Sequence, residues 1–236
     1  MIFYNMGNNY IERNNSFHTQ AAYYRLIAPL LFDSDRIIHL DGDTLIFKDL
    51  NEMYNLDFND NYVLGIYDFI SDGIDYLGIK SNIYINDGVI LFNLKKVRED
   101  NKIFGLIDMI TRKTYLKNED QTILNYILYP KIGRIPSKYV IINFNDKSSI
   151  NIYLNYLRTK FPMKEIEEAL NSPTIIHHIS CAPKPWFINL TFQKICSFND
   201  GQKKNCSCRK YFDIWHSFAK NTDYYEEIAK FTGVKI

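Results

Sequence analysis

The apolar positions of the chain alternate between helical and strand-like spacing. Between Ser16 and Phe32 they recur every three or four residues, which predicts a helix capped by Ser16 and kinked or ended by Pro29. The next apolar run, residues 36–40, stops at Asp41-Gly42-Asp43, as expected of a buried strand that opens into a loop. In open α/β sheets, ligands bind at this carboxyl end of a strand.

Further runs of both kinds follow along the chain. Strands are predicted at residues 62–67, 88–94, 139–143 and 174–179, and helices at 103–110, after Glu119-Asp120, at 210–219 and at 224–231. Strands that alternate with helices predict an α/β fold whose mixed sheet is mostly parallel and flanked by helices. We expect one domain over residues 1–236, with a core at 17–186 and a C-terminal loop and helical tail at 187–236.

Composition narrows the class of protein. The chain is 46% hydrophobic and 23% charged with a net charge of +1, which is typical of a globular domain and lacks the basic footprint of nucleic-acid binding. No stretch approaches the roughly 18 apolar residues that span a bilayer, and the first residues do not resemble a signal peptide. As written, the chain is expected to be cytoplasmic. Cys206 and Cys208 lie too close together for a zinc knuckle.

Two segments carry residue types that bind metal and phosphate. Asp41 and Asp43 can chelate one hard cation from a turn, and Gly42 between them leaves space for a phosphate. His178 can add an imidazole ligand, and Lys184, six residues later, can add a positive charge for phosphate. The alternatives are a solvated turn at residues 41–43 and a core histidine followed by a proline-bounded surface turn.

Two further segments carry polar groups suited to sugar hydroxyls. Asp120 and Gln121 pair a carboxylate with an amide at a predicted helix start, where acidic residues also serve simply as helix-capping groups. Asn86 and Asp87 precede Gly88 and interrupt an apolar strand. A glycine there marks either a close approach of ligand to the backbone or an ordinary bulge.

Together these motifs resemble glycosyltransferase family 8, the glycogenin and bacterial lipopolysaccharide galactosyl- and glucosyltransferase type. The resemblance runs from about Tyr23 to Trp186 and keeps the family's order and spacing. The matching segments are Tyr24-Arg25-Leu26, the Asp-x-Asp strand at 38–43, the Asn-x-Gly strand at 84–94, the Asp-Gln helix start at 120–125 and the segment from His178 to Lys184-Pro185-Trp186.

The resemblance implies a GT-A-like fold and a retaining hexosyltransferase. Asp41, Asp43 and His178 would hold Mn²⁺ or Mg²⁺ on the diphosphate of a UDP-sugar, and Lys184 would steady the departing UDP. Donor-sugar contacts would come from Arg25, Asp68, Asn86, Asp87 and Asp120. Gln121 takes the place of the family's candidate nucleophile, but an amide is a poor nucleophile, so front-face transfer with internal return is at least as plausible. The acceptor would be a glycan, a lipid-linked sugar or a protein.

The chain departs from the family pattern in two respects. It lacks the family's first nucleotide-binding βαβ segment, so we expect an N-terminally truncated sequence whose missing part could have carried a signal or anchor, and whose activity could be impaired. Cys181 stands where the family usually has glycine beside phosphate, and Asp87 where a small residue is common. A side chain at Cys181 would crowd the phosphate, and both departures bear on the geometry of the donor.

Two other functions remain open at this stage. A phosphatase of the haloacid dehalogenase type also has Asp-x-Asp after an apolar strand, with the first aspartate as nucleophile. Leu45 and the absence of a later acidic pair argue against it. A degenerate transferase that only binds sugars or proteins would keep the scaffold. Asp41, Asp43, His178 and Lys184 are all present, which favours an intact site.

Overall fold

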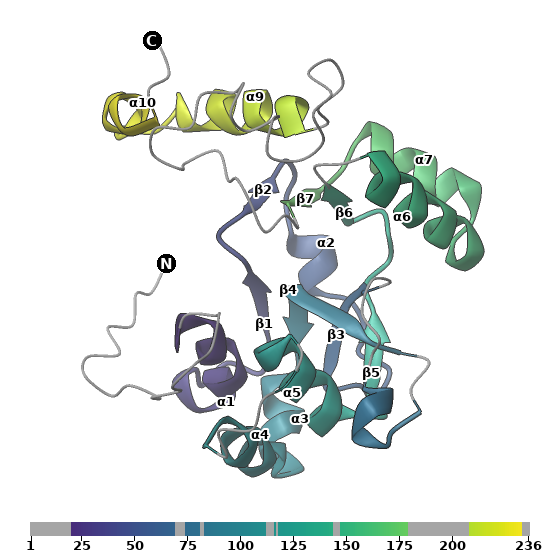
Figure 1. Ribbon diagram of the computed structural model, residues 1–236. Helices are drawn as coiled ribbons and strands as arrows, with labels where there is room; N and C mark the ends of the chain where they lie inside the picture. The colour runs from purple at the N-terminus through teal and green to yellow at the C-terminus, as the bar shows by residue number, and fades with distance from the viewer. Residues whose placement is uncertain are drawn as a thin grey trace. The chain divides into compact units, whose positions relative to one another are not determined.

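The chain forms two compact units, drawn as ribbons in Figure 1. The computed structural model describes residues 20–68, 74–80, 83–111, 116, 118–143, 147–178 and 208–232. Unit 1 is Met1–Leu40 with Leu50–Pro136, and unit 2 is Asp41–Asp49 with Ser137–Ile236. The chain crosses between the units at three places. The expectation of a single domain over residues 1–236 stays a prediction.

Unit 1 is built on a four-stranded sheet in the order β1-β4-β3-β5. Its strands are β1 (Ile37–Leu40), β3 (Val63–Tyr67), β4 (Ile85–Phe92) and β5 (Ile132–Arg134). β4 runs antiparallel to β1 and β3, while β5 runs parallel to β3. The strands predicted from the apolar runs are confirmed, and β4 begins earlier than predicted because two polar residues lie inside it.

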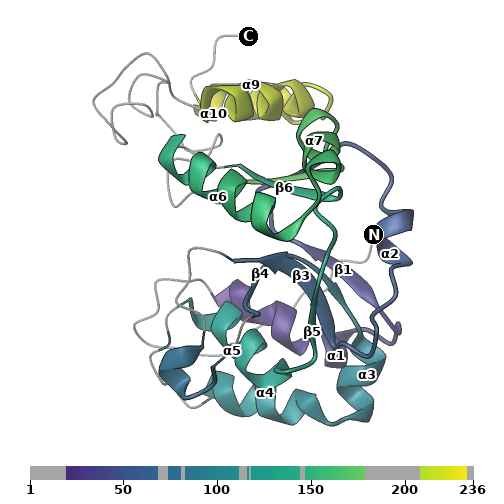
Figure 2. The same cartoon turned by 90° about the vertical axis from the view of Figure 1, so that its right-hand side faces the viewer.

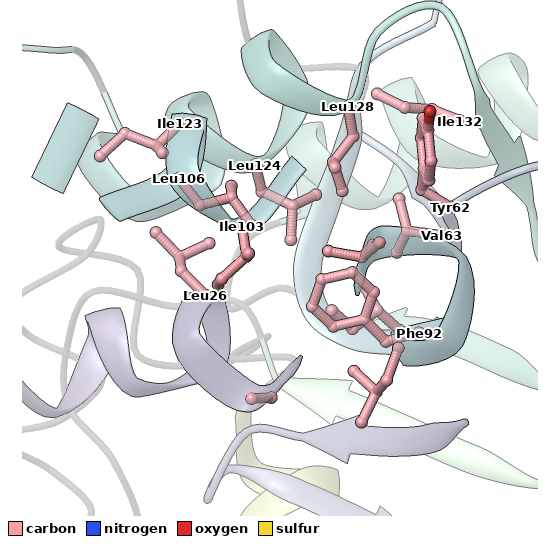
Figure 3. Close-up of a cluster of buried hydrophobic side chains, with 14 of the residues drawn as sticks. Leu26, Tyr62, Val63, Phe92, Ile103, Leu106, Ile123, Leu124, Leu128 and Ile132 are labelled. Carbon is pink, nitrogen blue, oxygen red and sulfur yellow. The ribbon is translucent and has the colours of Figure 1, made fainter. Parts of the chain in front are cut away.

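Helices cover one face of this sheet (Figures 1 and 2). They are η1 (Gln20–Ile27), α1 (Ala28–Leu31), α3 (Leu94–Glu99), α4 (Lys102–Thr111) and α5 (Glu119–Leu128). Leu26, Leu106, Ile123 and Phe92 are fully buried where these helices meet β4 (Figure 3). Two short helices, α2 (Asn51–Tyr54) and η2 (Asp75–Leu77), lie in connections.

The helix predicted over residues 16–32 differs in detail. Its described part is a 3-10 helix followed by one α-helical turn, and Pro29 lies in the first turn of α1 rather than at a helix end. Proline is tolerated there because the first turn of an α-helix has no intrahelical partner for that amide. Pro29 therefore marks where the helix type changes.

Unit 2 contains a three-stranded sheet in the order β2-β7-β6. The strands are β2 (Thr44–Ile46), β6 (Val140–Asn143) and β7 (Ile175–His178), with β2 antiparallel and β6 parallel to β7. The helices are α6 (Lys147–Lys160), α7 (Met163–Asn171), α9 (Cys208–Ala219) and α10 (Tyr225–Thr232). α7 packs against β6 and α6. Both predicted strands and both C-terminal helices are confirmed.

The predicted α/β class is confirmed, with mixed sheets flanked by helices. The expected excess of parallel pairing is wrong for the described strands, since β1, β2 and β3 each have an antiparallel partner. Parallel neighbours need a crossover that is usually helical. The described part of the connection from β3 to β4 holds only η2, so β4 returns antiparallel. Among the described residues, no helix has the length and apolar character to cross a membrane.

Candidate functional site

In unit 1, a bulge in β4 brings polar groups together. β3 pairs Gly65 with Ile90 and then Ile66 with Asn86, so residues 87–89 are left out of this ladder. The Gly88 amide donates to Asn86 Oδ1 (3.0 Å), and Arg25 donates to the Asp87 carbonyl (2.8 Å). Of the two alternatives for Gly88, the structure shows the bulge, and such bulges re-aim neighbouring side chains.

Arg25 connects this bulge to the start of α5. Its guanidinium lies 3.2 Å from Asp87 Oδ1 and 3.3 Å from Asp120 Oδ2. The three side chains are only 8–10% exposed. Buried carboxylates require compensating charge or hydrogen bonds, so Arg25 lets two acids from different elements share one buried site.

The start of α5 is buried and has an unusual backbone. Asn118 and Glu119 have φ angles of 51° and 24°. Asparagine tolerates positive φ, but for glutamate it is costly and persists only where the surroundings enforce it. Tyr23, which lies in η1, donates a hydrogen bond from its hydroxyl to the Glu119 carboxylate. Glu119, Asp120 and Gln121 are 7%, 6% and 6% exposed, so these first-turn residues of α5 are buried.

A second set of contacts locks α5 against β4. Asn125 is fully buried and uses its side-chain amide like a peptide group: it accepts from the Ile85 amide and donates to the Ile85 carbonyl, both at 2.8 Å. The Tyr84 hydroxyl bonds Thr122 Oγ1 at 2.9 Å. Sequence reasoning assigned no role to Asn125, although an asparagine inside an apolar helix, against its helix propensity, was the available signal.

The remaining predicted residues of unit 1 complete the network. Gln121 donates to Asp68 Oδ2 (2.8 Å) and accepts from Asn86 (2.9 Å). Asp68 follows β3 directly, and its amide donates to the Tyr84 carbonyl. The structure thus brings together all the unit 1 residues predicted for the site, which are Arg25, Asp68, Asn86, Asp87, Asp120 and Gln121.

In unit 2, Asp41 and Asp43 lie in the turn that precedes β2, and His178 is the last residue of β7. The Thr44 amide and hydroxyl both donate to the Asp41 carbonyl, at 3.2 and 2.8 Å, which closes the turn through Gly42 and Asp43. β2 pairs Thr44 with His177 of β7, so one further step in this register sets Asp43 across from His178. Among the described side chains, no three His, Cys, Asp or Glu groups converge as a metal site, so the Asp41, Asp43 and His178 ligand set stays a prediction. The His178 side chain, Cys181 and Lys184 lie outside the described residues.

One modest pKa change in unit 1 lies next to this network, and the largest ones lie away from it. Burial raises the pKa of Tyr67, next to Asp68, so this phenol stays neutral. Burial also raises the pKa of Tyr62 to about 12, and hydrogen bonds from Lys131 and Lys96 lower that of Asp60 to about 2. Tyr62 precedes β3 and Asp68 follows it, about 20 Å apart along an extended strand. This charged cluster therefore belongs to the other end of the sheet.

Comparison with known proteins shows what the chain resembles. The sequence pattern described as "Glycosyl transferase family 8" matches residues 1–189. General stress protein A of Bacillus subtilis (strain 168) is 26% identical over 191 residues, covering 77% of this chain and 65% of that protein. Lipopolysaccharide 1,2-glucosyltransferase of Escherichia coli is 29% identical over 181 residues, covering 70% and 49%. The chain thus spans one half to two thirds of these relatives.

Solved structures show the same fold. The apo structure of the bifunctional glycosyltransferase WbbM aligns with a TM-score of 0.67 at 21% identity, covering 94% of this chain and 39% of that one. The galactosyltransferase LgtC, solved with donor and acceptor sugar analogs, aligns with a TM-score of 0.56 at 17% identity, covering 89% and 72%. The expected GT-A-like fold is confirmed.

Proposed function

The chain belongs to glycosyltransferase family 8, and from this premise we propose that it is a metal-dependent retaining hexosyltransferase. It would move glucose or galactose from a UDP-sugar to a glycan, lipid-linked or protein acceptor. The observation that carries the proposal is the buried network of unit 1, in which Arg25 and Gln121 join carboxylates and amides from separate elements. Two relatives are themselves named a glucosyltransferase and a galactosyltransferase.

The unit 1 network suits a sugar that develops positive charge. Asp68, Asp87 and Asp120 supply carboxylates, and Asn86 and Gln121 supply amides that both donate and accept. Groups already held in place by one another need little rearrangement when charge develops in the transition state. In this proposal Asp120 and Gln121 act nearest the reacting carbon, and Arg25 and Asp87 hold the surrounding hydroxyls.

The route to retention follows from how Gln121 is bonded. Its amide oxygen accepts a hydrogen bond from Asn86, and its nitrogen donates to Asp68. A hydrogen bond to the oxygen withdraws electron density from an already weak nucleophile. We therefore favour front-face transfer, in which Gln121 stabilises the developing charge without forming a bond to the sugar.

Asp41, Asp43 and His178 would hold Mn²⁺ or Mg²⁺ in unit 2, where oxygen and imidazole ligands suit such ions. When bound, the ion would stabilise the charge of the departing UDP as a Lewis acid. Lys184 would bind the same diphosphate, and Gly42 and Cys181 would lie beside it. These roles are proposals that rest on the donor set and on the pairing of β2 with β7.

Calorimetry with UDP-glucose and UDP-galactose tests this function. Binding is expected with Mn²⁺ and is expected to disappear with EDTA. Asp43→Asn should lower the rate of transfer at least about 100-fold, because loss of a metal ligand removes several kcal/mol of charge stabilisation. Asp49→Asn, an exposed carboxylate of the same unit, is the matched control. Absence of UDP-sugar binding with Mn²⁺, or magnesium-dependent hydrolysis of p-nitrophenyl phosphate that Asp41→Asn abolishes, would refute the proposal.

Gly42→Ala separates a ligand role from a folding role. A Cβ at Gly42 would meet no atom of the described residues within 4 Å, so the melting temperature should not change. If the diphosphate approaches this backbone, the added methyl group should weaken UDP-sugar binding roughly tenfold, a cost of about 1–3 kcal/mol for overpacking. Gly65→Ala is the contrasting variant, because its Cβ would lie 2.7 Å from Ile85 Cδ1 and should destabilise the fold. Unchanged affinity in Gly42→Ala would place the phosphates elsewhere.

A further inference from the structure

Three hydrogen bonds in unit 1 form a chain with a single direction. The Gly88 amide donates to Asn86 Oδ1 at 3.0 Å, Asn86 Nδ2 donates to Gln121 Oε1 at 2.9 Å, and Gln121 Nε2 donates to Asp68 Oδ2 at 2.8 Å. The chain begins on the β4 bulge, crosses the start of α5 and ends after β3. Together the links join three neighbouring elements of the site.

The two ends of this chain determine its direction. A backbone amide can only donate, and an ionised carboxylate can only accept. If the Asn86 amide were reversed, its nitrogen would face the Gly88 N–H. If the Gln121 amide were reversed, its oxygen would face the Asp68 carboxylate and its nitrogen would face that of Asn86. Each reversal places like groups together, so only one arrangement satisfies all four partners.

We propose that Asp68 and Asn86 are positioning residues that hold the Gln121 amide in one orientation, with its oxygen toward β4 and its nitrogen toward Asp68. This inference deepens the proposed function and rests on it for its catalytic meaning: the donor sugar would always meet the same end of the amide. Asp68 then acts through Gln121 and need not contact the sugar. Its charge matters because a carboxylate cannot donate back to the Gln121 nitrogen.

Gln121→Glu is the diagnostic substitution. It sets a second carboxylate beside Asp68, and like charges that share a site raise the pKa of one of the pair. A raised folded-state pKa means that stability is complete at low pH and is lost as pH rises through that pKa. We therefore expect the melting temperature of Gln121→Glu to match the parent near pH 4.5 and to fall below it by about 3 °C or more at pH 8.

A second substitution should restore the chain. When Asp68→Asn is combined with Gln121→Glu, the amide introduced at position 68 and the amide of Asn86 can both donate to the new carboxylate. Hydrogen bonding then lowers the folded-state pKa of that carboxylate, and the deficit at pH 8 should disappear. Asp68→Asn alone should cost little stability, because an amide oxygen can still accept from Gln121. Asp33→Asn, an exposed carboxylate of unit 1, is the control for loss of one charge and should leave both measurements unchanged.

Transfer rates give the second measurement. Gln121→Glu should lower the rate about 100-fold, and the double variant should regain at least tenfold of it, mainly in kcat. The inference is wrong if the shifts in melting temperature caused by Gln121→Glu and Asp68→Asn simply add at pH 8. It is also wrong if the deficit of Gln121→Glu has no pH dependence. Both outcomes hold whether or not the chain transfers sugar. If the parent shows no transfer and no UDP-sugar binding while the pH-dependent rescue is observed, the positioning stands and the proposed function fails.

Discussion

Replacing Arg25 by methionine is expected to lower the free energy of unfolding by about 3–5 kcal/mol and to abolish transfer, because it leaves two buried carboxylates without their common cation. The side chains of Asp87 and Asp120 are 9% and 8% exposed and lie 3.2 and 3.3 Å from the guanidinium. The Asp87 carbonyl also loses its hydrogen bond from Arg25. Chemical denaturation measures the first effect, and UDP-sugar turnover measures the second.

Arg36→Met is the matched control for this experiment. Arg36 also donates to backbone carbonyls, those of Tyr54 and Leu56, and lies over the Phe58 ring. Its loss should cost only about 1 kcal/mol, as for ordinary hydrogen bonds. Adding Asp87→Asn to Arg25→Met should recover part of the lost stability, since a buried charge that has lost its ion pair with Arg25 is removed. Equal losses for Arg25→Met and Arg36→Met would show that Arg25 does not neutralise a buried acid pair.

Replacing Asn125 by alanine is expected to lower the free energy of unfolding by about 2–5 kcal/mol, because two buried backbone groups lose their partners. The Asn125 side chain bonds both the N–H and the C=O of Ile85, which lies 40 residues away in the sequence. The start of α5 should then shift against β4, so donor affinity should fall as well. Denaturation and calorimetry measure the two effects.

Asn125→Asp distinguishes hydrogen bonding from packing at the same position. A carboxylate still accepts from the Ile85 amide but cannot donate to the Ile85 carbonyl, and burial would raise its pKa. Its stability deficit should therefore grow as pH rises through that pKa and shrink in acid. Asn55→Ala, at an exposed asparagine that also donates to a backbone carbonyl, is the control and should change stability by less than about 0.5 kcal/mol. A deficit of Asn125→Asp that is constant with pH would contradict this account.

Many segments with clear apolar spacing could be predicted from the sequence, but the helices α6 and α7 and the shortest strands were missed. α4 and α5 each show helical spacing over ten residues, and β3 and the part of β4 from Gly88 onward are apolar runs. β2 and β5 have three residues each, which is too few to show a period, so both were missed. Their strand conformation depends on pairing with β7 and β3 rather than on local spacing.

The candidate site divides in the same way. The residue types of Arg25, Asn86 and Asp120, and their order along the chain, were visible in the sequence. A bulge at Gly88 was one of two alternatives that the sequence left open. The contact of Tyr23 with Glu119 joins residues 96 positions apart, and the hydrogen bonds between Asn125 and Ile85 join residues 40 positions apart. Neither could be predicted from the sequence. Local patterns carry no information on which distant polar groups will be buried against each other.

By itself, the sequence determined the α/β class, the family and the set of polar residues available for chemistry, because these depend on local periodicity and on residue identity in a fixed order. Only the tertiary structure decided that Arg25 serves two acids, that α5 begins in a left-handed conformation and that the Gln121 amide has one orientation. Those features arise from burial, which forces each polar group to find a partner on another element.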